Sequence, residues 1–192
     1  MPLLPALAFA RQLIEGRLKN GGRALDGTAG NGRDTLFLAQ LVGGNGKVWA
    51  FDIQAQALSN TAGLLRENGV EERVELIATS HADLADYVRE PLDAAMFNFG
   101  YLPGGDKTVT TKADSSVRAM QAAAALLAEG GLLTAVVYSG HPAGRAEAAA
   151  IEQWAAALPQ EQYQVLHYRF TNQRNHPPQL LAIEKHIQKP NR

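Results

Sequence analysis

The 192 residues, 46% of them hydrophobic and 19% charged, suit one globular domain with a sizeable core. A formal net charge of −1 argues against bulk-electrostatic binding of nucleic acid, though not against a local basic patch, and the absence of cysteine excludes disulfides, thiolate metal sites and cysteine nucleophiles. There is no signal-peptide pattern and no apolar run near the ~20 residues that span a bilayer, so we expect a cytoplasmic protein with no membrane partner.

Apolar periodicity and turn residues divide the chain into alternating strands and helices. The first helix is interpreted as a lid or packing helix that ends at Asn20-Gly21-Gly22, and Gly130-Gly131 are expected to cap an alanine-rich helix. We expect helices over 6–19, 35–41, 55–68, 84–89, 115–128 and 145–158, and strands over 23–25, 47–51, 74–78, 94–97, 132–138, 163–169 and 180–185. This alternation predicts one doubly wound α/β domain over residues 1–192, with a mostly parallel seven-stranded sheet. The last two strands, joined without a helix, predict an antiparallel hairpin at one edge.

The glycine-rich segment 26–34 lies between the first strand and the next helix. Glycine lets a ligand approach the backbone closely, and the helix N-terminus directs its free N–H groups toward that ligand. Asp52 ends the second strand, twenty residues beyond Gly32, where an acid can accept both hydroxyl hydrogens of a ribose. A structural turn, with Asp52 capping the next helix, is the alternative. Because Thr35 replaces the third glycine of the dinucleotide fingerprint and Asp26 leads the loop, we favour S-adenosylmethionine over NAD.

Other polar segments also follow predicted strands, so they should meet at the carboxyl edge of the sheet, where ligands bind in open α/β folds. Gln54 is interpreted as a second ribose or adenine contact, or else as an exposed helix residue. Ser80 and His81 are interpreted as readers of an adenine edge, or else as local hydrogen-bonding residues. The five histidines show no metal-ligand spacing, and we predict no metal.

The segment Asn98-Phe99-Gly100-Tyr101 indicates the reaction type. It resembles the Asn-Pro-Pro-Tyr loop of amino-group methyltransferases, in which the Asn side chain and a backbone carbonyl accept hydrogen bonds from the substrate amine. Those acceptors leave the nitrogen lone pair free to face the methyl sulfonium. Phe99-Gly100 replaces Pro-Pro here, and an ordinary tight turn covered by Tyr101 is the alternative. His141 is interpreted as a substrate contact or base, or else as a structural residue before proline.

Several strings together resemble a known family. They are Asp26-Gly-Thr-Ala-Gly-Asn-Gly-Arg-Asp-Thr35, Phe51-Asp52-Ile53-Gln54, Ser80-His81, Asn98-Phe-Gly-Tyr-Leu-Pro-Gly-Gly-Asp-Lys107, Gly140-His-Pro142 and Asn172-Gln-Arg-Asn175-His-Pro-Pro178. They look like the ribosomal-RNA methylase family of small, Rossmann-like class I methyltransferases, from about Arg11 to Lys185. Despite that family name, the resemblance implies a transfer-RNA enzyme that uses S-adenosylmethionine to methylate the aminomethyl group of 5-aminomethyl-2-thiouridine at the wobble position. Two residues depart from the family pattern: Phe99 stands where members often carry Leu, and His176 stands where an Asp is common.

The resemblance also implies roles for individual residues. The segment Asn98 to Lys107 and the loop 172–178 would face the tRNA anticodon region. The candidates are Asn98, Tyr101 and His141 as catalytic residues; Asp26, Thr28, Gly30, Asn31, Gly32, Asp34, Asp52, Gln54, Ser80 and His81 for the cofactor; and Gly100, Pro103, Asp106, Lys107, Asn172 and Asn175 for the substrate.

An alkylamine must lose a proton before it attacks a methyl group. Desolvation and orientation by Asn98 would favour the neutral amine, with His141 or Asp106 as the proton acceptor. The basic residues Arg33, Lys107, Lys112, Arg118, Arg169 and Arg174 are expected either at phosphates or simply in solvent, and Tyr101 or Phe99 is expected to stack on a base.

Two further functions stay open from sequence. One is a small-molecule or rRNA methyltransferase on the same scaffold, and the other is a nucleotide- or NAD-binding protein without methyl transfer. The oligomeric state is also open, with a homodimer as one alternative. Fold alone does not choose among them.

Overall fold

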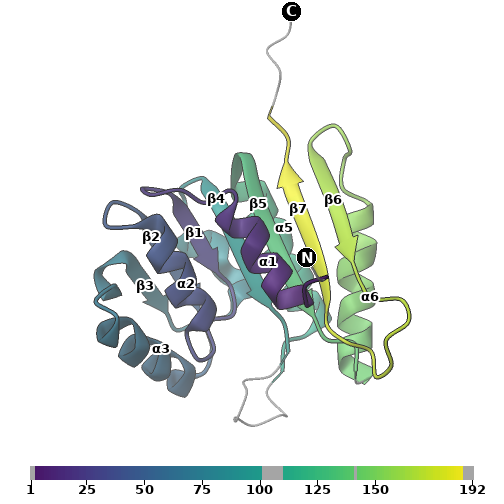
Figure 1. Cartoon of the computed structure of the whole chain (residues 1–192), viewed down its shortest axis with the longest axis horizontal. Helices are drawn as coiled ribbons and strands as arrows, with labels where there is room; N and C mark the ends of the chain where they lie inside the picture. The colour runs from purple at the N-terminus through teal and green to yellow at the C-terminus, as the bar shows by residue number, and fades with distance from the viewer. Residues whose placement is uncertain (1–2, 101–109, 141, 188–192) are drawn as a thin grey trace, which may run out of the picture.

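The computed structural model describes residues 3–100, 110–140 and 142–187, which form a three-layer α/β structure around a seven-stranded sheet (Figure 1). The spatial order is β3-β2-β1-β4-β5-β7-β6. The first five of these pair in parallel, whereas β7 runs antiparallel to both of its neighbours. The predicted sheet and its antiparallel edge hairpin are therefore confirmed. The strands are β1 (Arg23–Asp26), β2 (Lys47–Phe51), β3 (Val74–Ile77), β4 (Leu92–Asn98), β5 (Leu127–Val137), β6 (Tyr163–Tyr168) and β7 (Gln179–Lys185).

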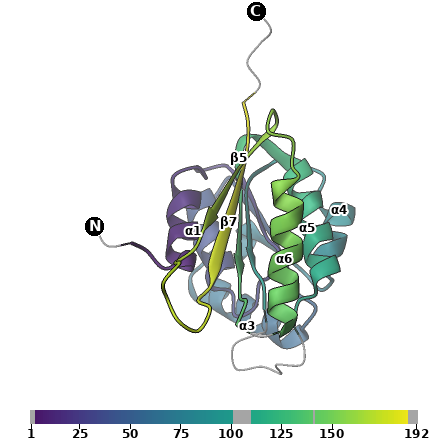
Figure 2. The same cartoon turned by 90° about the vertical axis from the view of Figure 1, so that its right-hand side faces the viewer.

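Helices cover both faces of the sheet, with α1 on one side and α4, α5 and α6 on the other (Figure 2). The helices α2 and α3 share the face of α1, and each face has its own apolar cluster. The helices are α1 (Ala6–Glu15), α2 (Arg33–Val42), α3 (Ala55–Glu67), α4 (Leu84–Tyr87), α5 (Ala113–Leu126) and α6 (Pro142–Ala156), with short 3-10 turns η1 (Glu71–Arg73) and η2 (His81–Asp83).

The apolar run of β4 shows why the sequence forms a central strand. Ala95 and Phe97 pack toward α5, while Ala94 and Met96 pack toward α1 and α2. A strand buried on both faces needs apolar residues at successive positions, and that requirement favours a parallel sheet covered by helices. This arrangement places the end of β4 in the middle of the carboxyl edge.

Several predicted helix ends are wrong, and for α1 and α5 the structure shows the reason. The helix α1 ends at Glu15, four residues early, because the chain turns at Gly16 while Leu18 still packs in the core. The helix α5 ends at Leu126 because the backbone of Leu127 already pairs with Leu92 of β4. The next pair is Ala94 with Leu132, so the intervening residues form a bulge that contains Gly130 at a φ of +75°.

The direction of β6 decides where the last loop lies. Because β7 is antiparallel to both β5 and β6, the strands β5 and β6 point the same way. The loop 169–178 therefore leaves the sheet at the same carboxyl edge as the loops after β1, β2 and β4 (Figure 1). Within the described part of the chain, no helix has the length and apolar character needed to cross a membrane.

Candidate active site

The glycine loop after β1 is held between two strands of the sheet. The Gly27 N–H donates to the Met96 carbonyl of β4 at 2.9 Å, and the Ala29 N–H donates to the Phe51 carbonyl of β2 at 2.9 Å. A Cβ on Gly27 would lie 2.1 Å from Cε1 of Phe97, so only glycine fits this close approach. The loop thus lies close against the ends of the strands.

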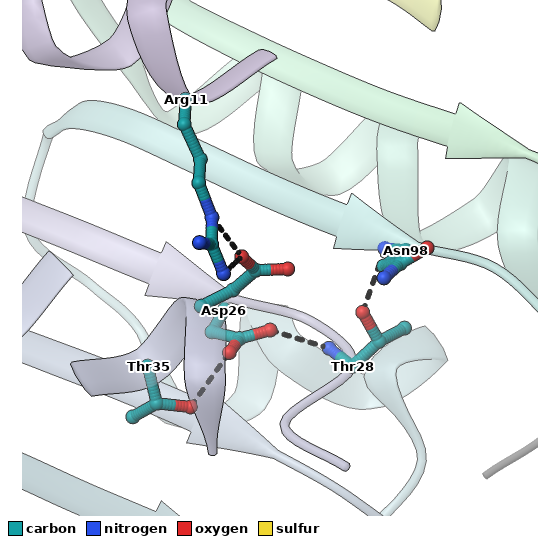
Figure 3. Close-up of polar contacts among 6 residues, drawn as sticks. Arg11, Asp26, Thr28, Thr35 and Asn98 are labelled. Atoms are coloured by element: carbon teal, nitrogen blue, oxygen red, sulfur yellow. Dashed lines mark hydrogen bonds and ion pairs between the residues drawn. The ribbon is translucent and has the colours of Figure 1, made fainter. Parts of the chain in front are cut away.

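The Asp26 side chain stabilises this loop through two hydrogen bonds. Its carboxylate accepts hydrogen bonds from the Thr28 N–H at 3.0 Å and the Thr35 hydroxyl at 2.6 Å (Figure 3). Burial, followed by the charge of Asp34, raises the pKa of Asp26 to about 7. Both oxygens of Asp26 therefore already have partners inside the protein.

The first helix also reaches the loop. Arg11 of α1 places Nε at 2.9 Å and Nη2 at 2.7 Å from one oxygen of Asp34, which is buried in the first turn of α2. Negative charge in that first turn suits the dipole of α2, and Arg11 compensates it. The helix α1 is thus a packing helix that also contributes a side chain at the candidate site.

Asp52 lies at the end of β2 with each carboxylate oxygen held by one backbone N–H. Oδ2 accepts from Gly30 and Oδ1 accepts from Gln54, both at 2.9 Å. A carboxylate oxygen can accept more than one hydrogen bond, so Asp52 keeps acceptor capacity for a ligand. The next residue, Ile53, is 62% exposed. The sequence pattern gave Ile53 no role of its own, although a large apolar residue in the loop after a buried strand is unusual.

Three other predicted cofactor residues have local roles in this structure. The Asn31 side chain accepts from Asn60 of α3 at 3.0 Å, and Ser80 accepts from the Ala82 N–H at 3.2 Å as the cap of η2. The His81 ring packs edge-on against Phe97 and Phe99 and hydrogen-bonds the Gly27 backbone. Burial lowers the pKa of His81. Its Nε2 atom is buried and has no hydrogen-bond partner among the described residues.

The end of β4 is tied directly to the glycine loop. The Asn98 N–H donates to the Thr28 hydroxyl oxygen at 2.7 Å (Figure 3). Phe99 is fully buried and stacks on Phe97 with ring centroids 5.2 Å apart. The expectation that Phe99 stacks on a base is therefore wrong, because its ring belongs to the core between the sheet and α5.

Gly100 and Thr111 are joined in both directions. The Gly100 N–H donates to the Thr111 hydroxyl at 2.9 Å, and the Thr111 N–H donates to the Gly100 carbonyl at 3.0 Å. Five predicted site residues lie outside the described ranges, and the structure says nothing about them: Tyr101, Pro103, Asp106, Lys107 and His141.

Asn172 and Asn175 are exposed in the loop after β6. Asn175 and His176 adopt φ values of 65° and 46°, a left-handed conformation that is uncommon for non-glycine residues but more frequent for Asn and His than for most. Beside them an open hollow of about 360 Å³ is lined by residues of this segment, Arg169, Phe170, Thr171, Gln173, His176, Pro177 and Gln179. In the described ranges, no three His, Asp or Glu side chains gather as they would around a metal ion.

Comparison with known proteins gives one family and several close relatives. The sequence model of the family described as "Putative rRNA methylase" matches residues 48–184. A "tRNA (mnm(5)s(2)U34)-methyltransferase, chloroplastic" of Arabidopsis thaliana is 37% identical over 164 residues, which are 80% of this chain and 60% of the relative. This chain thus spans only about three fifths of that relative's length.

Two crystal structures match over nearly their full length. A "putative rRNA-methylase" from Clostridium thermocellum is 38% identical with a TM-score of 0.95, over 96% of this chain and 100% of the other. A "putative methyltransferase" from Streptococcus mutans, solved with S-adenosylhomocysteine, is 35% identical with a TM-score of 0.89, over 96% and 99% of the two chains.

Proposed function

We propose that this chain, which belongs to the family described as "Putative rRNA methylase", methylates an amine on a tRNA nucleoside. The family match covers more than half of the chain and confirms the predicted resemblance. It also confirms the enzyme class, an S-adenosylmethionine-dependent methyltransferase, and its cofactor, in agreement with the relative that was solved with S-adenosylhomocysteine. The substrate, a tRNA and one of its nucleosides, is the proposal.

The proposed substrate is 5-aminomethyl-2-thiouridine at the tRNA wobble position. It is supported by the name of the Arabidopsis relative, in which mnm(5)s(2)U34 denotes 5-methylaminomethyl-2-thiouridine at position 34, the product of methylating that aminomethyl group. The observation that carries the proposal is the hydrogen bond from the Asn98 N–H to the Thr28 hydroxyl, because it joins the end of β4, where the amine would bind, to the cofactor loop. Such a tie favours transfer between two groups held at a fixed separation.

The cofactor would lie along the loop after β1. Asp52 would accept the ribose hydroxyls with the acceptor capacity left by Gly30 and Gln54, and exposed Ile53 would cover the adenine. Gly32 has a φ of +79°, a left-handed conformation that glycine adopts without a steric cost, at the turn before α2. Four predicted cofactor residues would position the site without contacting the cofactor, because each already bonds to the loop or to a segment beside it. They are Asp26, Thr28, Ser80 and His81.

The reaction begins with an ammonium group that must lose a proton. The neutral nitrogen then attacks the methyl carbon; a C–N bond forms, the C–S bond breaks, and its electron pair goes to sulfur to give S-adenosylhomocysteine. The product is a secondary ammonium, which releases a proton to solvent. The Asn98 side chain and a neighbouring backbone carbonyl would orient the amine, and desolvation would lower its pKa. His141 and Asp106 stay candidates for the first proton acceptor.

Recognition of the anticodon would fall to the loop after β6, which includes Asn172 and Asn175 and lies at the same edge as Asn98. The exposed basic residues Arg169 and Arg174 there would meet phosphates. Assembly as a homodimer and a cytoplasmic location stay predictions.

The test is methyl transfer from labelled S-adenosylmethionine to bulk tRNA with or without the 5-aminomethyl group, followed by digestion to nucleosides. We expect label in 5-methylaminomethyl-2-thiouridine only with the modified tRNA. Asn98→Ala should lower turnover at least about 100-fold, whereas Asn68→Ala, a matched change at the exposed end of α3, should not. Label in ribosomal RNA or in small amines instead would contradict the tRNA assignment, and stabilisation by NADH but not by S-adenosylhomocysteine would contradict the cofactor.

A further inference from the structure

We infer that Glu147 is a positioning residue for methyl transfer, acting through the Thr111 hydroxyl on the backbone at Gly100. The inference rests on the proposed function, in which the end of β4 presents the hydrogen-bond acceptors for the amine. Glu147 lies on α6 and is 3% exposed. It was not among the residues that the sequence indicated.

The Glu147 carboxylate accepts hydrogen bonds from two hydroxyl groups. Oε2 lies 2.9 Å from the Thr111 hydroxyl and Oε1 lies 2.5 Å from the Ser116 hydroxyl of α5. The Thr111 hydroxyl in turn accepts from the Gly100 N–H at 2.9 Å. A buried carboxylate is tolerated when its oxygens are satisfied in this way.

The direction of this chain of hydrogen bonds is fixed by the acid. A carboxylate only accepts, and a hydroxyl has a single hydrogen, so Thr111 must donate to Glu147. Its lone pairs are then left for the Gly100 N–H. A neutral or apolar residue at position 147 would release the Thr111 hydrogen to rotate toward other partners.

The hydrogen bond that holds the Gly100 N–H also fixes the orientation of the Phe99 carbonyl. The peptide unit is planar and trans, so the Phe99 carbonyl points opposite to the Gly100 N–H. The preceding N–H groups are fixed as well, that of Asn98 by Thr28 and that of Phe99 by the Val136 carbonyl at 3.0 Å. Three successive peptide groups are thus oriented by three different elements. The Phe99 carbonyl is the backbone acceptor that would share the amine with the Asn98 side chain.

Gly100 needs this support more than an ordinary residue does. Its φ of +143° lies in a region that glycine enters freely, and among the described residues a Cβ there would meet only Tyr138, at 3.7 Å. Glycine has more backbone freedom than any other residue. Without the Thr111 hydroxyl, packing around Gly100 would hold this peptide only weakly.

The decisive experiment compares Thr111→Val with Ser116→Ala. Each removes one hydroxyl from Glu147, but only Thr111 touches Gly100. We would measure kcat and KM for modified tRNA, the Kd for S-adenosylhomocysteine, and hydrogen exchange of the Gly100 amide. Thr111→Ser, which keeps the hydroxyl, is the rescue variant, and Glu147→Gln tests the acid itself.

For Thr111→Val we expect kcat to fall about 10- to 100-fold, the Gly100 amide to lose protection, and the Kd for S-adenosylhomocysteine to stay within about twofold of wild type. Ser116→Ala should keep kcat and Gly100 protection, and Thr111→Ser should restore both. Glu147→Gln should lower both partly, since an amide NH2 group replaces one of the two carboxylate oxygens and cannot accept, so that one of the two hydroxyls loses its acceptor.

Equal losses of kcat in Thr111→Val and Ser116→Ala would overturn the inference, because Glu147 would then only join α5 to α6. Unchanged Gly100 exchange in Thr111→Val would overturn it as well. These outcomes differ from failure of the proposed function, in which wild-type protein would transfer no methyl group to modified tRNA although the Gly100 exchange still responds to Thr111→Val.

Discussion

Two buried carboxylates, Asp26 and Glu147, support the two halves of the site in different ways. Asp26 holds partners within nine residues of itself, the Thr28 N–H and the Thr35 hydroxyl. Glu147 holds hydroxyls that lie 36 and 31 residues away along the chain, on the far side of β5 in the sequence. Asp26 therefore supports its own loop through contacts within one local segment, whereas the support that Glu147 gives to the amine half depends on tertiary packing of α6.

This difference predicts how the two halves respond to change. A local loop braced by its own acid keeps its shape as long as β1 and α2 are folded. A backbone held from another helix is sensitive to any shift of that helix. We therefore expect changes around Asp26 and Asp52 to alter cofactor binding, and changes around Glu147 to alter turnover at unchanged cofactor affinity.

The largest effect is expected where the two halves touch, at Gly27. In Gly27→Ala the new Cβ would lie 2.1 Å from the buried Phe97 ring, so the ring or the loop must move. We expect a loss of about 2–4 kcal/mol in the free energy of unfolding, measured in urea. Gly44→Ala is the control, because nothing lies within 4 Å of that position and its effect should be under about 0.5 kcal/mol. Equal effects at both glycines would contradict the contact.

Asp52→Ala should weaken cofactor binding and leave the amine half of the site unchanged. It removes the acceptors for the ribose and the partners of the Gly30 and Gln54 N–H groups. Hydrogen bonds to a charged group contribute about 1.5–3 kcal/mol, so the Kd for S-adenosylhomocysteine should rise about 10- to 100-fold by calorimetry. Protection of the Gly100 amide should not change. Asp86→Asn on the exposed face of α4 is the control, and an unchanged Kd in Asp52→Ala would remove Asp52 from the cofactor site.

Asp26→Asn should change the pH dependence of stability. The folded pKa of Asp26 is raised from 3.8 to about 7, so the folded state holds this proton more tightly than the unfolded state does. Its contribution to stability is complete below about pH 4 and is lost as the pH rises toward 7, by at most about 1.4 kcal/mol per pH unit. Asparagine mimics the protonated acid. Urea unfolding from pH 5 to 8 should therefore show wild type losing stability relative to the variant, and a constant difference would contradict the raised pKa.

The smallest effect is expected at Arg11. Its ion pair with Asp34 is partly exposed, with 35% of the Arg11 side chain accessible, so Arg11→Gln should cost under about 1 kcal/mol and less at high salt. Arg17→Gln, which breaks the exposed pair with Glu184, should cost a similar amount. Only Arg11→Gln should weaken S-adenosylhomocysteine binding, by up to about threefold, because only Arg11 reaches the loop. If both variants bind equally well, α1 serves packing alone.

The local half of the site could be predicted from sequence, and the packed half could not. Asp26, Gly27 and Asp52 are marked by strand ends and glycine spacing, which are patterns of neighbouring residues. Glu147 lies in an alanine-rich helix, where a single acid resembles an ordinary solvent-facing residue, and its partners Thr111 and Ser116 carry no motif of their own. Only the packing of α6 on α5 brings these three side chains together.

Three other features have the same physical cause, contacts between segments that are far apart in the sequence. His81 was interpreted either as a reader of an adenine edge or as a local hydrogen-bonding residue, and its ring packs edge-on against Phe97 and Phe99, a contact between separate segments. The sequence predicts the antiparallel edge hairpin, but its pattern does not say whether β6 or β7 pairs with β5. The end of α5 was misplaced because the pairing of Leu127 with Leu92 overrides the helix propensity of the alanine-rich segment.

The insertion of β7 between β5 and β6 has a consequence for how the chain reaches its folded state. Until residues 179–185 arrive, β5 has one unpaired edge and β6 has no strand to pair with. Closing the sheet therefore waits for contacts of long sequence separation, which are slow to form. During synthesis on the ribosome, the strand that leads into residue 139 would stay exposed until the last strand emerges, so chaperones would meet an open sheet edge at this point.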